Sequence, residues 1–226
     1  MSDMLDYLAD LEANNNREWY HEHKRELQKA SREFEKLIEE LSLSIGQFDS
    51  GIGYHNPKDL TFRLARDTRF SKDKTPYNPS FRACMAPAGK KPIPVGYYIA
   101  ITPGNRSFLG GGLHEATFSE ATTMVREYIV SHGNELATII NCKDFSSLLT
   151  LQGAALKNVP RGYDAEHPQA EYLKFKSWFM QVPIADSLIN SADFIEEASQ
   201  IFKAMQPMND YLNDALKGIQ LARRKQ

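Results

Sequence analysis

The spacing of apolar residues changes along this 226-residue chain, and this change most limits the folds available to it. Between Arg17 and Ile45 the apolar residues recur every three or four positions, the period of one face of an amphipathic helix. From about residue 60 apolar and polar residues alternate instead, as in a strand with one buried face. Helices and strands do not alternate as they would around a parallel sheet. We predict a single α+β domain over residues 1–226, with an antiparallel sheet and flanking helices.

Capping signals set the expected ends of the helices. A short helix is expected to end at the asparagine run 14–16, because asparagine adopts the left-handed conformation and also caps a following helix. Thr117 and Glu120 have the spacing of a capping box, and Gly133 marks a stop. Pro207 fits the first position of a separate last helix that ends in the basic sequence ARRK. The longer helices are expected near 17–45, 119–131, 191–205 and 207–221.

The strand signals lie between these helices. The turn sequence Pro-Gly-Asn at 103–105 separates two apolar runs and predicts a hairpin. The three glycines at 110–112 predict a bulge that bends an edge strand. The strands are expected at about 60–65, 81–85, 96–102, 107–109 and 174–184.

Composition and charge exclude some classes of protein. The chain has 27 Lys and Arg residues and 29 Asp and Glu residues, a net charge of −2, which disfavours a nucleic-acid coat protein but permits a local basic patch. Cys84 and Cys142 match no metal or redox spacing and predict free thiols in a reducing compartment. No secretory signal is recognisable, and no apolar run approaches the roughly 20 residues that span a bilayer. We expect a cytoplasmic protein without a membrane partner, and the sequence specifies no oligomeric state.

The segment RLARDTRFSKDKTPYNPSF, at 63–81, gathers positive charge in an irregular stretch. Its two prolines keep the residues before them extended, so we expect the end of a strand followed by an ordered loop. Arginine grips phosphate or carboxylate with two hydrogen bonds, and lysine adds a point charge. The basic residues are Arg63, Arg66, Arg69, Lys72 and Lys74, and the acidic residues are Asp67 and Asp73.

Several motifs together resemble one family. They are NNNREWYHEHK, RLARDTRFSKDKTPY, GYYIAI, GGGL and LKNVPRGYDAEHP. On these motifs the chain resembles the domain-of-unknown-function 2461 family, which is widespread and mostly microbial, from Leu5 to about Pro183. The resemblance implies a single domain of about this size and supplies no activity. The stretch APAGKKPIPVGYY, before the hairpin, is longer than the resemblance leads us to expect.

A second basic loop, at 156–168, contains Lys157 and Arg161. Arg161 lies on a Pro-Arg-Gly-Tyr turn that would present its guanidinium to an anion. We expect the two basic loops to converge, so that Arg161 shares a ligand or acids with Arg66 or Arg69. The alternative is a plain surface loop whose own acids neutralise its charge.

The chain has no motif for a nucleotide, a metal or an activated nucleophile. His21 and His23 are two residues apart on the same helix and point to different faces, so they form no metal pair. The sequence therefore indicates no metal site and no particular cofactor. Asp67, Asp73 and His114 are the candidates for acid–base chemistry.

The leading functional hypothesis is a pocket at the end of the sheet that binds a phosphorylated or otherwise anionic small molecule. A phosphorylated metabolite or a nucleotide would supply the phosphate or carboxylate, and whether it is turned over stays open. The residues proposed to bind it are Arg66, Arg69, Lys72, Lys74 and Arg161, with Arg63 and Lys157 nearby.

Two other classes of function fit the same residues. In a nucleic-acid-binding module, the basic segment would follow a single strand while Phe70, Tyr77 and Tyr97 stack on bases. In a non-catalytic scaffold, Asp67 would pair with Arg66 or Arg69, and Asp73 with Lys72 or Lys74, in a structural ion network. A concave basic pocket favours the metabolite, an open basic stripe favours nucleic acid, and a buried, fully paired network favours the scaffold.

Overall fold

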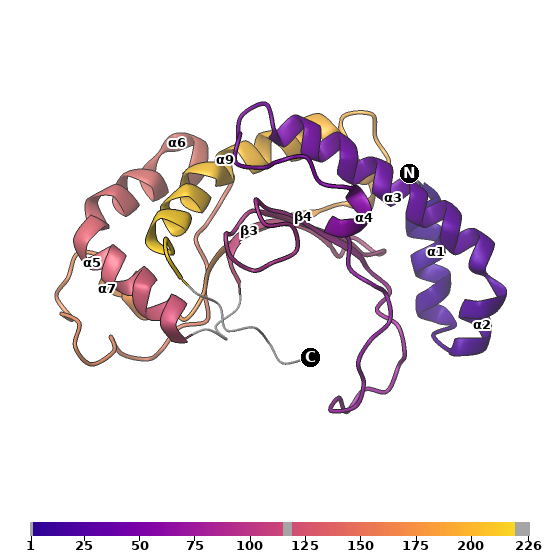
Figure 1. Cartoon of the computed structure of the whole chain (residues 1–226), viewed down its shortest axis with the longest axis horizontal. Coiled ribbons are helices and arrows are strands. Elements are labelled where there is room, and N and C mark those ends of the chain that lie inside the picture. Colours follow the sequence, from indigo (N-terminus) through magenta and orange to yellow (C-terminus); the bar gives the residue numbers. More distant parts are fainter. Residues whose placement is uncertain (1, 115–118, 220–226) are drawn as a thin grey trace. The chain divides into compact units, whose positions relative to one another are not determined.

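The computed structural model describes residues 2–114 and 119–219, and it has a mixed α+β fold (Figure 1). Its sheet is antiparallel and four-stranded, in the order β1-β2-β3-β4. The strands are β1 (Phe81–Met85), β2 (Tyr97–Ile101), β3 (Ser107–Leu113) and β4 (Trp178–Ile184). The predicted fold class is confirmed, as is the hairpin of β2 and β3.

Helices precede the sheet, follow it, and fill the connection between β3 and β4. The three long helices are α3 with 22 residues, α5 with 23 and α9 with 22. The described helices are α1 (Ser2–Ala13), α2 (Arg17–Glu22), α3 (Lys24–Ile45), α4 (Pro57–Leu60), α5 (Ser119–Asn141), α6 (Lys143–Ser146), α7 (Ala170–Leu173), α8 (Asp186–Ile189) and α9 (Phe194–Ala215).

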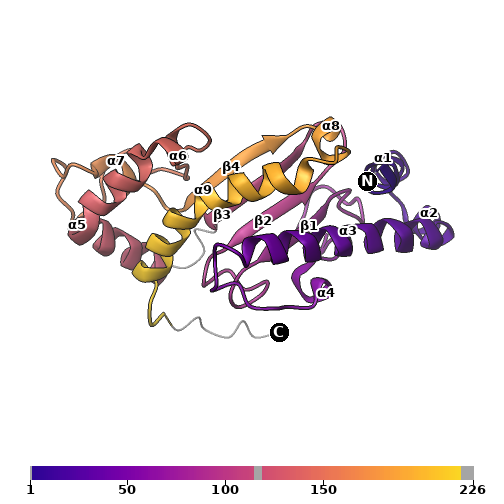
Figure 2. The same cartoon turned by 90° about the horizontal axis from the view of Figure 1, so that it is seen from above.

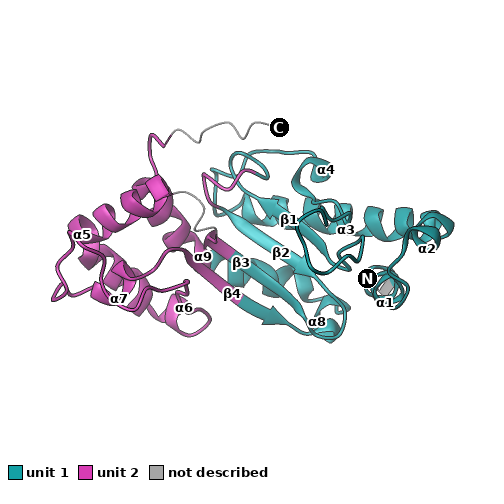
Figure 3. Ribbon diagram, turned by 90° about the horizontal axis from the view of Figure 1, so that it is seen from below, with its two compact units in different colours: residues 1–90, 96–110, 182–203 teal, residues 91–95, 111–181, 204–226 magenta. Residues whose placement is uncertain are grey.

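The chain divides into two compact units, each assembled from segments that are distant in sequence (Figure 3). Unit 1 contains residues 1–90, 96–110 and 182–203, and unit 2 contains residues 91–95, 111–181 and 204–226. The boundaries between the units fall inside β3, β4 and α9. A single domain over the whole chain stays a prediction.

In unit 1, α3 and the start of α9 lie on the same side of the strands (Figures 1 and 2). Phe34 of α3 stacks on Phe81 with ring centroids 5.3 Å apart, and Phe202 of α9 meets Tyr97 edge-on at the same separation. The β1 residues on this face are buried, and the alternate residues are half-buried. The helical period predicted for α3 is confirmed by its buried residues, which are Ala30, Phe34, Leu37, Ile38, Leu41 and Ile45.

The helix expected at 17–45 is divided at His23, whose backbone leaves the helical region with φ −100° and ψ 35°. Asn16 caps the first piece, because its side-chain oxygen accepts a hydrogen bond from the N–H of Trp19 at 2.9 Å. The ring of His23 stacks on Trp19 with centroids 4.1 Å apart, and its Nδ1 lies 2.9 Å from the Trp19 carbonyl oxygen. These contacts fix the bend where the sequence pattern alone predicts one continuous helix.

Other boundaries were predicted wrongly. The strand expected at 60–65 is absent, and the segment makes only isolated bridges to neighbouring chain. Pro207 lies inside α9 rather than at the start of a new helix. Met205 and Met208, on either side of it, are fully buried, so tertiary packing outweighs the roughly 3 kcal/mol that an interior proline costs.

Two further expectations concern helix ends. α5 continues past Gly133, with a kink at His132, one residue before the predicted stop. The capping residue Thr117 and the basic ARRK sequence lie outside the described residues.

The glycine-rich strand β3 lies inside the sheet and not at its edge, so the edge-strand interpretation of glycines 110–112 is wrong.

In unit 2, α5 is tied to the chain before β4 by Arg126. Its guanidinium donates hydrogen bonds to the carbonyl oxygens of Leu173 at 2.9 Å and Phe175 at 2.8 Å. Trp178, which begins β4, is 1% exposed and donates its ring N–H to the Tyr172 carbonyl at 3.0 Å. Desolvation by burial lowers the pKa of Arg126, because the charged guanidinium loses part of its contact with water.

Gly112 provides a test of the packing in unit 2. A Cβ atom here would lie 2.4 Å from the carbonyl oxygen of Trp178, and the φ angle of +95° disfavours any side chain. We expect Gly112→Ala to lower the free energy of unfolding by about 3 kcal/mol, measured by chemical denaturation. Gly53→Ala is the control, since no heavy atom lies within 4 Å of that Cβ position. Equal stability of the two variants would contradict this account of Gly112.

Candidate functional site

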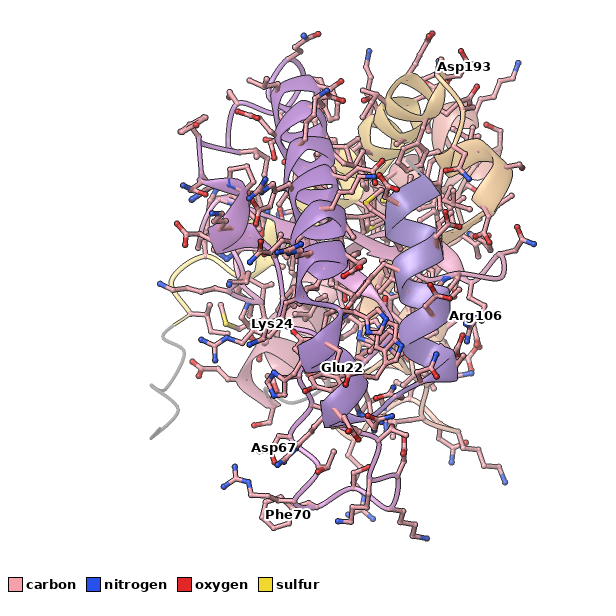
Figure 4. The ribbon with its side chains drawn as sticks, turned by 90° about the vertical axis from the view of Figure 1, so that its right-hand side faces the viewer. Glu22, Lys24, Asp67, Phe70, Arg106 and Asp193 are labelled. Carbon is pink, nitrogen blue, oxygen red and sulfur yellow. The ribbon has the colours of Figure 1, made fainter. Side chains whose placement is uncertain are left out.

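Residues 61–80, between α4 and β1, form an irregular hairpin that we call the basic arm. The N–H of Arg66 donates to the Pro76 carbonyl at 2.9 Å, and the N–H of Asn78 donates to the Leu64 carbonyl at 2.8 Å. Figure 4 shows Asp67 and Phe70 on this arm, at the end of the view opposite Asp193. The predicted ordered loop is therefore a hairpin whose two sides hold each other in place.

Asn15 and Tyr20 fix the base of the basic arm through Tyr77. The Asn15 side chain donates to the Tyr77 carbonyl at 2.9 Å and accepts from the Tyr77 N–H at 3.1 Å. The rings of Tyr20 and Tyr77 stack with centroids 3.9 Å apart and planes 12° from parallel. The asparagine run at 14–16 predicted only a helix break, and this second role of Asn15 was missed.

Both acidic residues of the basic arm form ion pairs with arginine. Arg66 pairs with Asp73 at 2.5 Å and Arg69 with Asp67 at 2.6 Å. The hydrogen bond from Arg69 lowers the pKa of Asp67 to about 2, and the bond from Arg66, assisted by Thr75, does the same for Asp73.

These ion pairs correct one expectation and weaken another. Asp73 pairs with Arg66 and not with Lys72 or Lys74 as expected. The side chains of Asp67 and Asp73 are 59% and 57% exposed, so water and salt screen both pairs. The basic arm therefore does not contain the buried, fully paired ion network that would favour a scaffold.

Several cations of the basic arm have no acidic partner. Arg63, Lys72 and Lys74 form no ion pair with any residue that the structure describes, although the Lys74 ammonium donates to the Thr68 carbonyl at 2.9 Å. Residues 57–90 contain eight Lys and Arg residues and three Asp residues, in a chain whose net charge is −2. The local excess of positive charge is therefore large and opposite in sign to that of the whole protein.

An aromatic surface adjoins the basic arm on the half-buried face of the sheet. Tyr98 of β2 stacks on Phe108 of β3 with centroids 5.8 Å apart, and Phe62 of the arm lies 6.1 Å from Tyr98. Arg82 is on the same face, with its guanidinium carbon 5.7 Å from the centre of the Phe62 ring. We call Phe62, Arg82, Tyr98 and Phe108 the aromatic face.

Arg82 is only partly satisfied within the aromatic face. One of its terminal nitrogens donates to the Arg63 carbonyl at 3.3 Å, and its Nε is buried without a hydrogen-bond partner. Cys84, which pairs with Tyr98 across β1 and β2, lies beside it. Burial raises the pKa of the Cys84 thiol to about 11, so it is protonated near neutral pH and is a poor nucleophile.

Two residues that were predicted to stack on nucleic-acid bases are not available for stacking. Tyr97 is fully buried on the covered face of the sheet, where its hydroxyl donates to Asp49 at 2.8 Å. Tyr77 is 8% exposed and stacks on Tyr20. Phe70 is 95% exposed, and Tyr98, the neighbour of Tyr97 on β2, is half-buried on the other face of the sheet.

The second basic loop lies in unit 2. Lys157 and Arg161 are exposed there, and Arg161 lines a cavity of about 560 Å³ together with Glu127, Tyr163 and His167. The basic arm belongs to unit 1. The expected convergence of the two loops on a shared ligand stays a prediction.

The three acid–base candidates remain a prediction as well. With a pKa of about 2 and an arginine partner, Asp67 and Asp73 are weak bases near neutral pH. His114 is exposed in unit 2, with its ring centroid 4.7 Å from that of Phe179.

A metal-binding cluster and a membrane-spanning helix are both absent from the described residues. In residues 2–114 and 119–219, no three His, Cys, Asp or Glu side chains are grouped so that they could hold a metal ion. Within the same residues, no helix combines the length and the apolar character needed to cross a bilayer.

The ion pair of Arg66 and Asp73 predicts a measurable pH dependence. Because the folded pKa of Asp73 is lowered, the pair stabilises the arm above about pH 4 and the effect is lost as the pH falls toward 2. We expect Arg66→Gln to raise the pKa of Asp73 toward its ordinary value of 3.8, measured by carboxyl ¹³C NMR. Arg69→Gln is the control, and should shift Asp67 while leaving Asp73 unchanged. An unaltered Asp73 pKa in Arg66→Gln would show that a group other than Arg66 lowers the pKa of Asp73.

Comparison with known proteins assigns the chain to a family. No curated protein and no solved structure matches it. One family model, described as "Conserved hypothetical protein (DUF2461)", matches residues 3–211, a range that includes the basic arm, all four strands and most of α9. The match covers most of the chain, in agreement with the motifs around the basic arm, and the chain belongs to the DUF2461 family.

Proposed function

We propose that this protein binds single-stranded nucleic acid along the basic arm and the aromatic face. The supporting observation is that unpaired cations and half-buried aromatic rings adjoin each other, with Arg63 and Phe62 consecutive in the chain. Lysine and arginine attract phosphates, and the exposed bases of a single strand stack on aromatic side chains. A duplex hides the faces of its bases, so the aromatic face suits a single strand.

The shape of the basic surface favours nucleic acid over the phosphorylated metabolite that leads the sequence-based hypotheses. The cavity beside the basic arm has a volume of about 260 Å³, and Arg63 is its one basic lining residue. Lys72 and Lys74 are on the exposed part of the arm. An extended polyanion can contact such a series of cations, whereas one small molecule in this cavity would reach one of them.

The net charge of −2 does not oppose this proposal. Charges separated by more than about 8 Å are largely screened at physiological salt, so a bound strand responds mainly to the nearest side chains. In residues 57–90 these side chains are mostly Lys and Arg.

The electrostatic part of the proposal is tested by Lys72→Gln combined with Lys74→Gln. We expect at least tenfold weaker binding of a fluorescent oligo-dT, because two phosphate contacts are lost. The slope of log K against log salt should become shallower by about 1.4, at about 0.7 for each contact to a single strand. Fluorescence anisotropy at several salt concentrations measures both quantities.

The matched control is Lys36→Gln with Lys203→Gln, which changes the net charge equally outside the basic arm. Its affinity for oligo-dT should equal that of the parent protein. Because Lys72 and Lys74 are exposed and without acidic partners, their replacement should leave the melting temperature unchanged. An arm variant that melts early and binds as the parent does would support the structural network instead.

The stacking part of the proposal is tested by Tyr98→Leu. Loss of one base–aromatic contact costs about 1–3 kcal/mol, so the dissociation constant for oligo-dT should rise at least fivefold, while the salt slope stays the same. Tyr54→Leu, which removes an 84% exposed tyrosine outside the aromatic face, should bind as the parent does. A weaker salt slope in Tyr98→Leu, or no change in affinity, would argue against stacking there.

A further inference from the structure

The cavity beside the basic arm lies between α3 and residues 61–65 in unit 1. Its apolar part includes Phe34 and Phe81, and its polar part includes Tyr20, Glu35 and Arg63. The volume of about 260 Å³ is below the roughly 300–1,000 Å³ of pockets for drug-sized ligands. A single flat ring system is a ligand of suitable size.

The two charged side chains of this cavity, Glu35 and Arg63, have no acidic or basic partner among the described residues. Glu35, half-buried on α3, forms no side-chain hydrogen bond and no ion pair with any residue in the described part of the chain. The guanidinium of Arg63 likewise has no described partner, although both side chains line the same cavity. A partly desolvated carboxylate without a donor is unfavourable, so a ligand with N–H groups would be stabilised there.

We infer that this cavity takes one base of the bound strand and selects guanine through Glu35. This inference rests on the proposed function. A carboxylate has two acceptor oxygens, and the pairing edge of guanine presents two adjacent donors, the N1–H and the N2 amino group. Adenine and cytosine present one donor beside an acceptor nitrogen, and thymine presents one donor between two carbonyl oxygens. Guanine is therefore the base that satisfies both oxygens of Glu35.

The other lining groups fit a base that belongs to a nucleotide. The ring of Tyr20 lies at the cavity and is held by its stack on Tyr77, so it offers a fixed aromatic surface. Arg63 supplies the cation for the phosphate attached to the same nucleotide. The same guanine chemistry is present in a strand and in free guanosine monophosphate, and the experiment separates the two.

The test uses the full chain and four eleven-nucleotide oligomers, namely oligo-dT and three versions with dG, dA or dC at the centre. We expect the dG oligomer to bind about tenfold more tightly than oligo-dT, as a good two-bond base contact gives, and the dA and dC oligomers to gain little. In Glu35→Gln the ratio of the dG and oligo-dT affinities should fall to near one. Glu39→Gln, on the exposed side of the same helix, is the control and should retain the tenfold ratio.

Each outcome separates this inference from the proposed function. If oligo-dT binds through Lys72 and Lys74, but dG gives no advantage or keeps its advantage in Glu35→Gln, the guanine site is overturned and the proposed function stands. If oligo-dT does not bind, while guanosine monophosphate binds and Glu35→Gln abolishes that binding, the proposed function is overturned and the cavity is a mononucleotide site. If neither ligand binds, both are overturned.

Discussion

The covering of one sheet face by α3 and the start of α9 is the constraint on which the candidate site depends (Figure 2). A strand sends successive side chains to opposite faces, so this covering divides each strand into two sets of residues. Tyr97 enters the core, while Tyr98, its neighbour, reaches the half-buried face. That division decides which residues of β1, β2 and β3 belong to the aromatic face beside the basic arm.

The period of the apolar residues predicted the fold class because burial of one helix face is a local property of the sequence. The residues buried in α3 are spaced as expected, and the β2–β3 hairpin is present. The errors occurred where distant contacts override local preference. Pro207 is carried inside α9 between buried methionines, and His23 ends α2 through its contact with Trp19.

The candidate site was predictable only in its charged part. The five basic residues of the arm stand out because their density is visible in the sequence, and two acids within ten residues suggested the ion pairs. The choice of Arg66 as the partner of Asp73 depends on the hairpin, which brings together residues seven apart. Glu35 gave no signal, because it is one of many acids on the polar side of a long helix, and only the fold places it at a cavity.

The two hydrogen bonds between Asn15 and Tyr77 have a consequence for the thermodynamics of binding. A free loop of about twenty residues would lose much conformational entropy when it closes on a ligand. Here the base of the loop is already fixed in the folded protein, so only the residues near the tip have freedom left to lose. In the proposed complex, Asn15 would therefore contribute to affinity by preorganisation, and its substitution would weaken that complex without removing a contact to the bound molecule.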